Sequence, residues 1–286
     1  MDRPKLVASD VDGTLLDPLE KVTPRTAAMI AKVLASSTPF VLVTGRPPRW
    51  VTPVARAAGL SGYAVCTNGA AVWDLGADRV VSARDVDPLQ LGDVTHALRR
   101  LLPDIRVAAE RTPADSSSLA VFATEPGFRN PWGHPTGIDR PKGTGTGGGM
   151  DVEDNVVPIA EVLGHPATKL LIRHHGLTSG ELADAAHSVL NGAGLEVTYS
   201  TDRGLIELSA AGVTKATGLA EVCELLDIPA ARVVAFGDMP NDLEMLRWSG
   251  HGVAMANAHG DVLTAADEVT ARNSEDGVAQ ILERWF

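Results

Sequence analysis

Short apolar runs that end in small polar residues recur along the N-terminal part of the chain. Residues 6–8, 40–43 and 64–66 are such runs, and they fit strands buried on both faces of a parallel sheet. Helices are expected between them, over residues 24–34 and 49–58. Strands that alternate with helices predict a doubly wound, Rossmann-like α/β core, and such sheets place their ligands at the carboxyl ends of the strands.

The pattern changes after a hairpin expected over residues 70–82. From residue 86 to residue 202, strands and helices follow in a different order, which predicts an inserted α+β cap domain. Within it, residues 126–150 hold four prolines and eight glycines, so a surface loop is expected there.

The strand–helix rhythm returns in the last third of the chain. Strands are expected at residues 205–208, 233–236, 253–255 and 268–270, and helices at 215–226, 243–248 and 277–285. We therefore expect a core domain built from residues 1–85 and 203–286, with a cap domain of residues 86–202 inserted between the two parts.

Reactive side chains stand where these strands end. Asp10 and Asp12 follow the first strand, and they would share one side of it if the strand continued. The chain after them, Thr14-Leu15-Leu16, lacks the oxygen ligands of a calcium loop. The other junctions carry Thr44, Asn68, Lys215, Asp238 and Asp242.

These residue types suit phosphoryl transfer. Magnesium takes one or two carboxylates together with waters and phosphate oxygens, and Asp10 and Asp238 could supply the carboxylates. The charge of a transferring phosphoryl group must be offset, which Lys215, hydroxyl donors and backbone N–H groups can do together with the metal.

Composition narrows the function classes. The hydrophobic fraction is 44%, and the formal net charge of −11 disfavours nucleic acid and anionic membrane as partners. Cys66 and Cys223 are too few for a disulfide framework. No apolar run approaches the ~20 residues that span a membrane. The N-terminus shows no signal-peptide pattern, so the cytoplasm is expected.

Six short motifs occur in the N-terminal and C-terminal parts of the chain, and their order along the sequence can be compared with that of known families. They are Asp10-Val-Asp12-Gly-Thr-Leu-Leu, Thr44-Gly45-Arg46, Asn68-Gly69, Gly212-Val-Thr-Lys215, Gly237-Asp238-Met-Pro-Asn241-Asp242 and Gly252-Val-Ala-Met255-Ala-Asn257-Ala258. With them the chain resembles the haloacid dehalogenase-like superfamily of phosphatases, and most closely its Cof-type branch.

The resemblance implies a role for each matching residue. Asp10 attacks phosphorus to form an aspartyl-phosphate, and Asp12 protonates the leaving oxygen and then activates water. Thr44 holds a phosphoryl oxygen, and Lys215 neutralises the nucleophile and the phosphate.

The resemblance also implies Mg²⁺ as the cofactor. Its ligands are the Asp10 carboxylate, the Asp12 main-chain carbonyl and Asp238, while Asp242 orders a ligating water or the lysine. Gly45, Arg46, Asn68 and Asn241 are candidates for substrate binding. Two alternatives stay open: Arg46 can pair with acidic groups, and the asparagines can form Asx-turns.

The predicted function is Mg²⁺-dependent hydrolysis of small phosphorylated metabolites, with sugar phosphates as the first expectation. A phosphomutase with the same aspartyl-phosphate chemistry is one alternative. A non-catalytic protein that binds phosphorylated ligands is another. The chain is expected to be a monomer or a homodimer.

Overall fold

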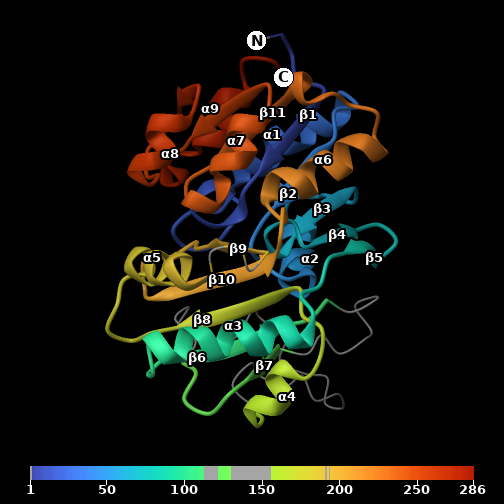
Figure 1. Ribbon diagram of the computed structural model, residues 1–286. Helices are drawn as coiled ribbons and strands as arrows, with labels where there is room; N and C mark the ends of the chain where they lie inside the picture. The colour runs from blue at the N-terminus through green and yellow to red at the C-terminus, as the bar shows by residue number, and fades with distance from the viewer. Residues whose placement is uncertain (1, 113–121, 130–155, 191, 193) are drawn as a thin grey trace, which may run out of the picture. The chain divides into compact units, whose positions relative to one another are not determined.

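The computed structural model describes residues 2–112, 122–129, 156–190, 192 and 194–286. The chain forms two compact units, which are described separately (Figure 1). The core unit contains residues 2–84 and 212–286, and the described residues of the inserted unit lie within 85–211.

One eight-stranded sheet organises the core unit, in the order β13-β12-β11-β1-β2-β3-β4-β5. The pairings from β13 to β3 are parallel, and β4 and β5 continue the sheet as antiparallel strands. The strands are β1 (Leu6–Ser9), β2 (Phe40–Val43), β3 (Tyr63–Cys66), β4 (Ala71–Asp74), β5 (Arg79–Ala83), β11 (Val233–Gly237), β12 (His251–Ala254) and β13 (Glu268–Val269).

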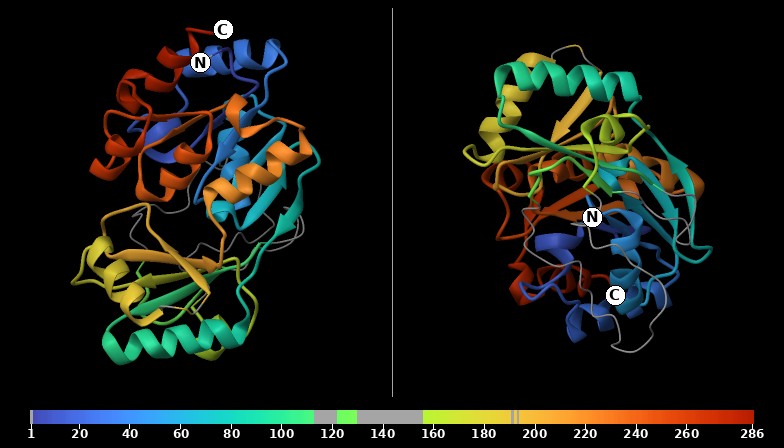
Figure 2. Two further views of the ribbon diagram at one scale, coloured as in Figure 1. Left: turned by 45° about the horizontal axis from the view of Figure 1, so that its top comes forward. Right: turned by 90° about the horizontal axis from the view of Figure 1, so that it is seen from below.

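Helices cover both faces of this sheet (Figure 2). One buried cluster joins the sheet to α1 (Pro24–Ala35), α2 (Pro48–Ala57) and α9 (Gly277–Leu282). The opposite cluster joins it to α6 (Lys215–Leu225), α7 (Leu243–Trp248) and α8 (Gly260–Ala265). The predicted Rossmann-like core is therefore confirmed, although the sequence pattern did not predict α8.

The inserted unit contains a five-stranded antiparallel sheet in the order β7-β6-β8-β10-β9. Its strands are β6 (Arg106–Glu110), β7 (Phe122–Thr124), β8 (Lys169–Arg173), β9 (Leu195–Thr198) and β10 (Leu205–Ala210). The buried cluster on one face includes side chains of α3 (Pro88–Leu101), α4 (Ile159–Leu163) and α5 (Ser179–Leu190).

One predicted strand lies in the wrong domain. Residues 205–208 were assigned to the core, but β10 pairs with β8 and β9 in the inserted unit. The apolar content of a strand shows that it is buried and does not show which sheet it joins. In the predicted loop 126–150, residues 126 and 127 lie in a turn, residues 128 and 129 have no regular structure, and the rest lie outside the described residues.

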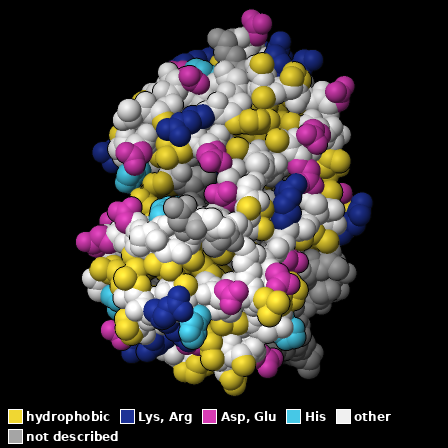
Figure 3. All heavy atoms as spheres, viewed as in Figure 1, with side chains coloured by type: hydrophobic (Ala, Val, Ile, Leu, Met, Phe, Trp, Pro, Cys, Tyr) yellow, Lys and Arg dark blue, Asp and Glu magenta, His cyan; other side chains and the backbone are white. Residues whose placement is uncertain are grey.

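The apolar length of the described helices and the charges on the surface are relevant to the predicted partners of the protein. Among the described residues, no helix is long and apolar enough to cross a membrane. On the face drawn in Figure 3, acidic and basic side chains are interspersed.

Both cysteine thiols belong to the core unit's interior, so we expect neither to react in the native protein. Cys66 and Cys223 are 0% and 3% exposed, and burial raises the pKa of the Cys223 thiol to about 11. The reactive thiolate is therefore scarce at about pH 8. Iodoacetamide followed by mass spectrometry should label neither cysteine in the native protein and both in denaturant. Rapid native labelling of either would contradict this packing.

Candidate active site

A buried lysine lies at the centre of the site. Lys215 is 1% exposed, and its Nζ donates hydrogen bonds to Asp10 Oδ1 at 2.6 Å and to Asp242 Oδ1 at 2.7 Å. Lys215 begins α6, directly after Thr214, whose hydroxyl caps that helix. Burial alone would favour the neutral amine, but the two carboxylates outweigh it and raise the pKa of Lys215. The side chain is therefore an ammonium.

Asp242 uses both of its carboxylate oxygens within the protein. Oδ1 accepts the bond from Lys215, and Oδ2 accepts the backbone N–H groups of Asp238 and Met239, each at 3.0 Å. Asp242 therefore fixes the end of β11 and the lysine at once, which agrees with the predicted role of ordering the lysine.

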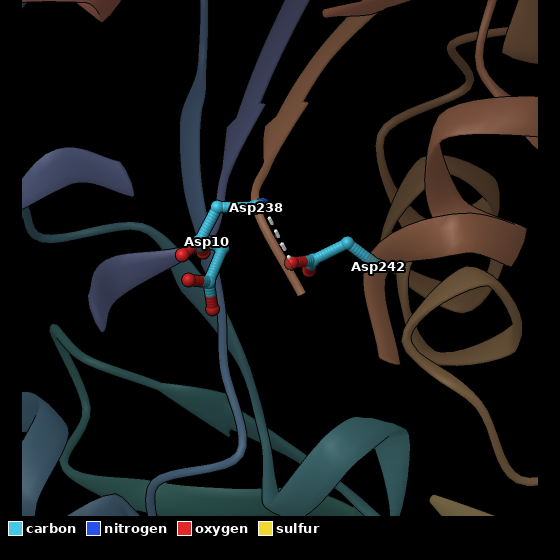
Figure 4. Close-up of side chains that lie close together, drawn as sticks. All are labelled: Asp10, Asp238 and Asp242. Atoms are coloured by element: carbon cyan, nitrogen blue, oxygen red, sulfur yellow. Dashed lines mark hydrogen bonds between the residues drawn. The ribbon is translucent and has the colours of Figure 1, made fainter. Parts of the chain in front are cut away.

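Asp10 and Asp238 are arranged differently, with their carboxyl groups next to each other (Figure 4). Oxygen atoms of Asp10, Asp238 and Asp242 lie within 4.8 Å of one another. Asp238 Oδ1 accepts a hydrogen bond from Thr14 Oγ1 at 3.0 Å. Asp10 Oδ2 and Asp238 Oδ2 have no hydrogen-bond partner among the described residues, so each carboxylate keeps one oxygen for a ligand.

The turn Val11–Leu15 brings the backbone close to Asp238. Gly13 has a φ of +77°, and a Cβ added there would lie 2.2 Å from Asp238 Oδ2. A side chain at this position would occupy the space beside the unpaired oxygen. Glycine is therefore required for both the conformation and the space.

The electrostatics of this cluster favour a cation. Burial, followed by the neighbouring carboxylates, raises the pKa of Asp238 to about 9. Burial also raises the pKa of Asp10 to about 7, although Lys215 opposes the shift. Three buried carboxylates thus face one ammonium group. A divalent cation would offset the remaining negative charge and favour the ionised carboxylates, so the donor set fits such an ion.

Asp12 lies apart from this buried cluster. Because β1 ends at Ser9 and the chain turns after Asp10, the strand does not continue and the two carboxylates do not share one side of it. The Asp12 side chain is 53% exposed and forms a two-point ion pair with Arg46, in which Nε donates to Oδ2 at 2.8 Å. Of the two roles considered for Arg46, the structure shows pairing with an acidic group.

The remaining candidates meet at the ends of β2, β3 and β11. Thr44 is 1% exposed, and its Oγ1 accepts the N–H of Arg46. Asn241 Nδ2 donates to Asn68 Oδ1 at 3.1 Å, and Asn241 Oδ1 is buried without a partner among the described residues. A Cβ at Gly45 would lie 3.0 Å from Asn68 Oδ1. The structure therefore gathers all the predicted site residues in the core unit.

Comparison with known proteins assigns the family. The family model for haloacid dehalogenase-like hydrolases matches residues 7–112 and 151–282 of the chain. The chain belongs to this family. The predicted resemblance to haloacid dehalogenase-like phosphatases is thereby confirmed.

Several curated phosphatases are similar to this haloacid dehalogenase-like chain. 5-Amino-6-(5-phospho-D-ribitylamino)uracil phosphatase YcsE of Bacillus subtilis is 28% identical over 98% of this chain and 95% of its own. Pyridoxal phosphate phosphatase YbhA of Escherichia coli is 26% identical, over 97% of both chains. The match to the B. subtilis phosphatase YitU, at 37% identity, spans 45% of this chain and 47% of that protein.

Solved structures support the fold. A haloacid dehalogenase-like hydrolase from B. subtilis superimposes with a TM-score of 0.77 at 21% identity, and the match covers 99% of this chain and 100% of that chain. The predicted combination of a Rossmann-like core with an inserted domain thus recurs in a solved protein of the same family.

A pair of asparagines braces the loop that carries the aspartates. Asn257 Nδ2 donates to the Gly13 carbonyl at 2.8 Å, and Asn257 Oδ1 accepts the Asn273 N–H at 2.9 Å. Asn273 Nδ2 in turn donates to the Leu16 carbonyl at 2.8 Å. The sequence pattern gave no signal for the contacts of Asn273, which begins the short 3-10 helix Asn273–Glu275 before α9.

Replacing Lys215 by methionine should strongly destabilise the core unit. The change leaves Asp10 and Asp242 buried without their shared cation, and breaking a buried pair in this way costs about 3–5 kcal/mol. Urea unfolding should show this loss, whereas the matched change at the exposed Lys21 should have almost no effect. Equal stability of the two variants would contradict the central role of the ammonium.

The asparagine brace should behave as one unit. Asn257→Ala and Asn273→Ala should each lower the free energy of unfolding by about 0.5–1.5 kcal/mol per lost bond. Because the Asn257 side chain accepts the backbone N–H of Asn273, the two positions are coupled, and the double variant should lose less than the sum. As a control, Asn257→Ala combined with Arg100→Gln in the inserted unit should be additive. If the loss of unfolding free energy in the double variant equals the sum of the two single losses, the two asparagines do not act as one unit.

Proposed function

We propose that this haloacid dehalogenase-like protein is a Mg²⁺-dependent phosphomonoester phosphatase that acts through a phosphorylated Asp10. The observation that carries the proposal is the pair of unpaired oxygens on Asp10 and Asp238, beside the ammonium of Lys215. One oxygen is available to attack, the other is available to a cation, and the lysine offsets charge on the nucleophile and the phosphoryl group.

The two proposed chemical steps give Asp10 and Asp12 the roles that the family resemblance implies. In the first step, Asp10 Oδ2 forms a bond to phosphorus while the ester P–O bond breaks, and Asp12 gives a proton to the leaving alcohol. In the second step, Asp12 removes a proton from water, the water oxygen attacks phosphorus, and the bond to Asp10 breaks to release phosphate. The exposed side chain of Asp12 lets it reach both oxygens, and Arg46 orients it.

Mg²⁺ would be held by Asp10, Asp238 and the main-chain carbonyl of Asp12, and it would supply positive charge to the phosphoryl oxygens. Asp242 would act through the lysine and the backbone, since both of its oxygens are already bonded. Thr44, Gly45, Asn68 and Asn241 would line the position of the phosphoryl group, where the unpartnered Asn241 Oδ1 could accept a bond from substrate.

We infer that the substrates are small phosphorylated metabolites, with sugar phosphates first in order of testing. The relatives' names support this class, because one names a phosphorylated ribityl compound and the other pyridoxal phosphate. We also propose that the enzyme works in the cytoplasm as a monomer or homodimer, without nucleic acid or membrane partners.

The direct test is phosphate release from an aryl phosphate. Wild type should release phosphate with Mg²⁺ and lose this activity with chelator. Asp10→Asn should fall by at least about a thousandfold, because no nucleophile remains. Leu19→Asn, an exposed change in the same unit, should keep full activity. Activity that survives in Asp10→Asn would refute the proposed nucleophile.

Product analysis separates hydrolysis from the mutase alternative. With sugar phosphates, free phosphate should accumulate in step with substrate loss. An isomerised sugar phosphate without net phosphate release would instead show that the phosphoryl group returns to sugar. Tight binding of phosphorylated ligands without turnover of any of them would favour the non-catalytic alternative.

A further inference from the structure

Positive charge gathers at one end of the sheet in the inserted unit. Arg106 of β6 lies directly opposite Arg173 of β8 in the antiparallel register. Leu205 of β10 is the partner of Arg173 on its other side, and Arg203 lies two residues before that strand begins. Like charges directly opposite each other destabilise a sheet. The pairing of Arg106 with Arg173 therefore lowers the stability of the sheet.

The two arginines share a face of the sheet with an apolar cluster. Side chains alternate along strands, so Arg106 lies on the side of Ala108, and Arg173 lies on the side of Leu171. These two apolar residues pack with Phe122, Leu205 and Phe128. The cluster that joins the helices contains the alternate residues Val107 and Ile172, so the arginines lie on the face opposite the helices.

The Arg173 side chain has buried hydrogen-bond donors that no described residue satisfies. Its Nε and Nη1 are buried, and neither has a hydrogen-bond partner among the described residues. In the same unit, Arg99 pairs with Glu125, and Arg111 donates to the carbonyls of Glu161 and Val162, although Arg111 Nε is also buried without a partner among the described residues. Leaving buried donors of a charged group unpaired is costly. No described residue therefore accepts a hydrogen bond from Nε or Nη1 of Arg173.

The electrostatic shifts in this region come from burial and from cations. The pKa of Arg173 is lowered by burial and by the charge of Arg203. The pKa of His175 is lowered by burial and then by four cationic or titratable neighbours, namely Arg173, Arg129, His174 and Arg106. The named causes of both shifts are burial and neighbouring Arg or His side chains.

We propose that these side chains form a binding site for an oxyanion, a phosphate or a carboxylate group, in the inserted unit. Guanidinium groups present several donors in a fixed geometry that matches the oxygens of either group. A bound oxyanion would accept the bonds of Arg173 and offset the repulsion between Arg173 and Arg106. The site shares no residue with the Lys215 site, so it goes beyond the proposed function.

The test follows Arg173 itself, in the full chain with chelator present. The side-chain Nε–H resonance of Arg173 is observed by NMR while inorganic phosphate, and separately succinate, is added. We expect a saturable shift with at least one of these anions. Arg106→Gln should weaken the affinity about tenfold, the scale of one charged hydrogen bond. Arg100→Gln, at the exposed end of α3, should leave the affinity unchanged.

Two controls make the result decisive. Thermal unfolding identifies variants that fail to fold, and Arg106→Lys, which keeps the charge but loses the planar donors, should shift the Arg173 resonance with a weaker affinity than wild type. No saturable shift for either anion would overturn the proposal. Equal affinities of the Arg106→Gln and Arg100→Gln variants would overturn it as well. Because the readout needs no turnover, failure here is distinct from failure of the proposed function.

Kinetics then show where the anion comes from. If it is a second anionic group of the substrate, Arg173→Gln should raise KM at least about fivefold for doubly anionic phosphates and leave aryl phosphate turnover unchanged. If the anion is a separate ligand, Arg173→Gln should leave KM unchanged for both kinds of phosphate, although the wild type still shows the NMR shift. Both outcomes support the site and assign its ligand.

Discussion

The bonds between Lys215 and its two carboxylate partners are the constraint on which the site depends. They join residues separated by 205 and 27 positions in the sequence. Lys215 stands at the start of α6, Asp10 at the end of β1, and Asp242 just beyond β11. Since a buried charge without a partner is unstable, these three segments must come together for the core unit to fold. The same requirement places the nucleophile candidate within reach of the ammonium.

The lysine does not balance the site completely. One ammonium faces three carboxylates, and burial raises the pKa values of Asp10 and Asp238. The protein therefore keeps a region of excess negative charge at the carboxyl ends of its parallel strands. A cation would relieve that excess, and a phosphate dianion could then approach. Asn257 and Asn273 bond the carbonyls of Gly13 and Leu16 in the loop that follows Asp10. These bonds hold the loop without using the carboxylate oxygens of the aspartates.

Much of this arrangement was predictable because motifs at strand ends converge in a parallel sheet. Asp10, Thr44, Asn68 and Asp238 each follow a short buried strand, and parallel strands bring such ends to one edge. A turn at Gly13 was predictable from the residue type, but the ion pair of Asp12 with Arg46 was not, because it joins residues 34 positions apart. Asn273 was missed because its contacts depend on tertiary structure. The sheet membership of β10 was mispredicted because the domain boundary was drawn between β9 and β10, although these two strands are antiparallel neighbours in one sheet.

The central claim is that Asp10 becomes phosphorylated, and trapping that species tests it most directly. Asp12→Asn should slow hydrolysis of the intermediate, because no base remains to activate water. This variant, mixed with a labelled phosphomonoester and Mg²⁺ and quenched in acid, should carry one labelled phosphoryl group on the peptide that contains Asp10. The account predicts that this label is absent from Asp10→Asn. Rapid turnover with no covalent label on Asp10, or a label on another residue, would contradict it.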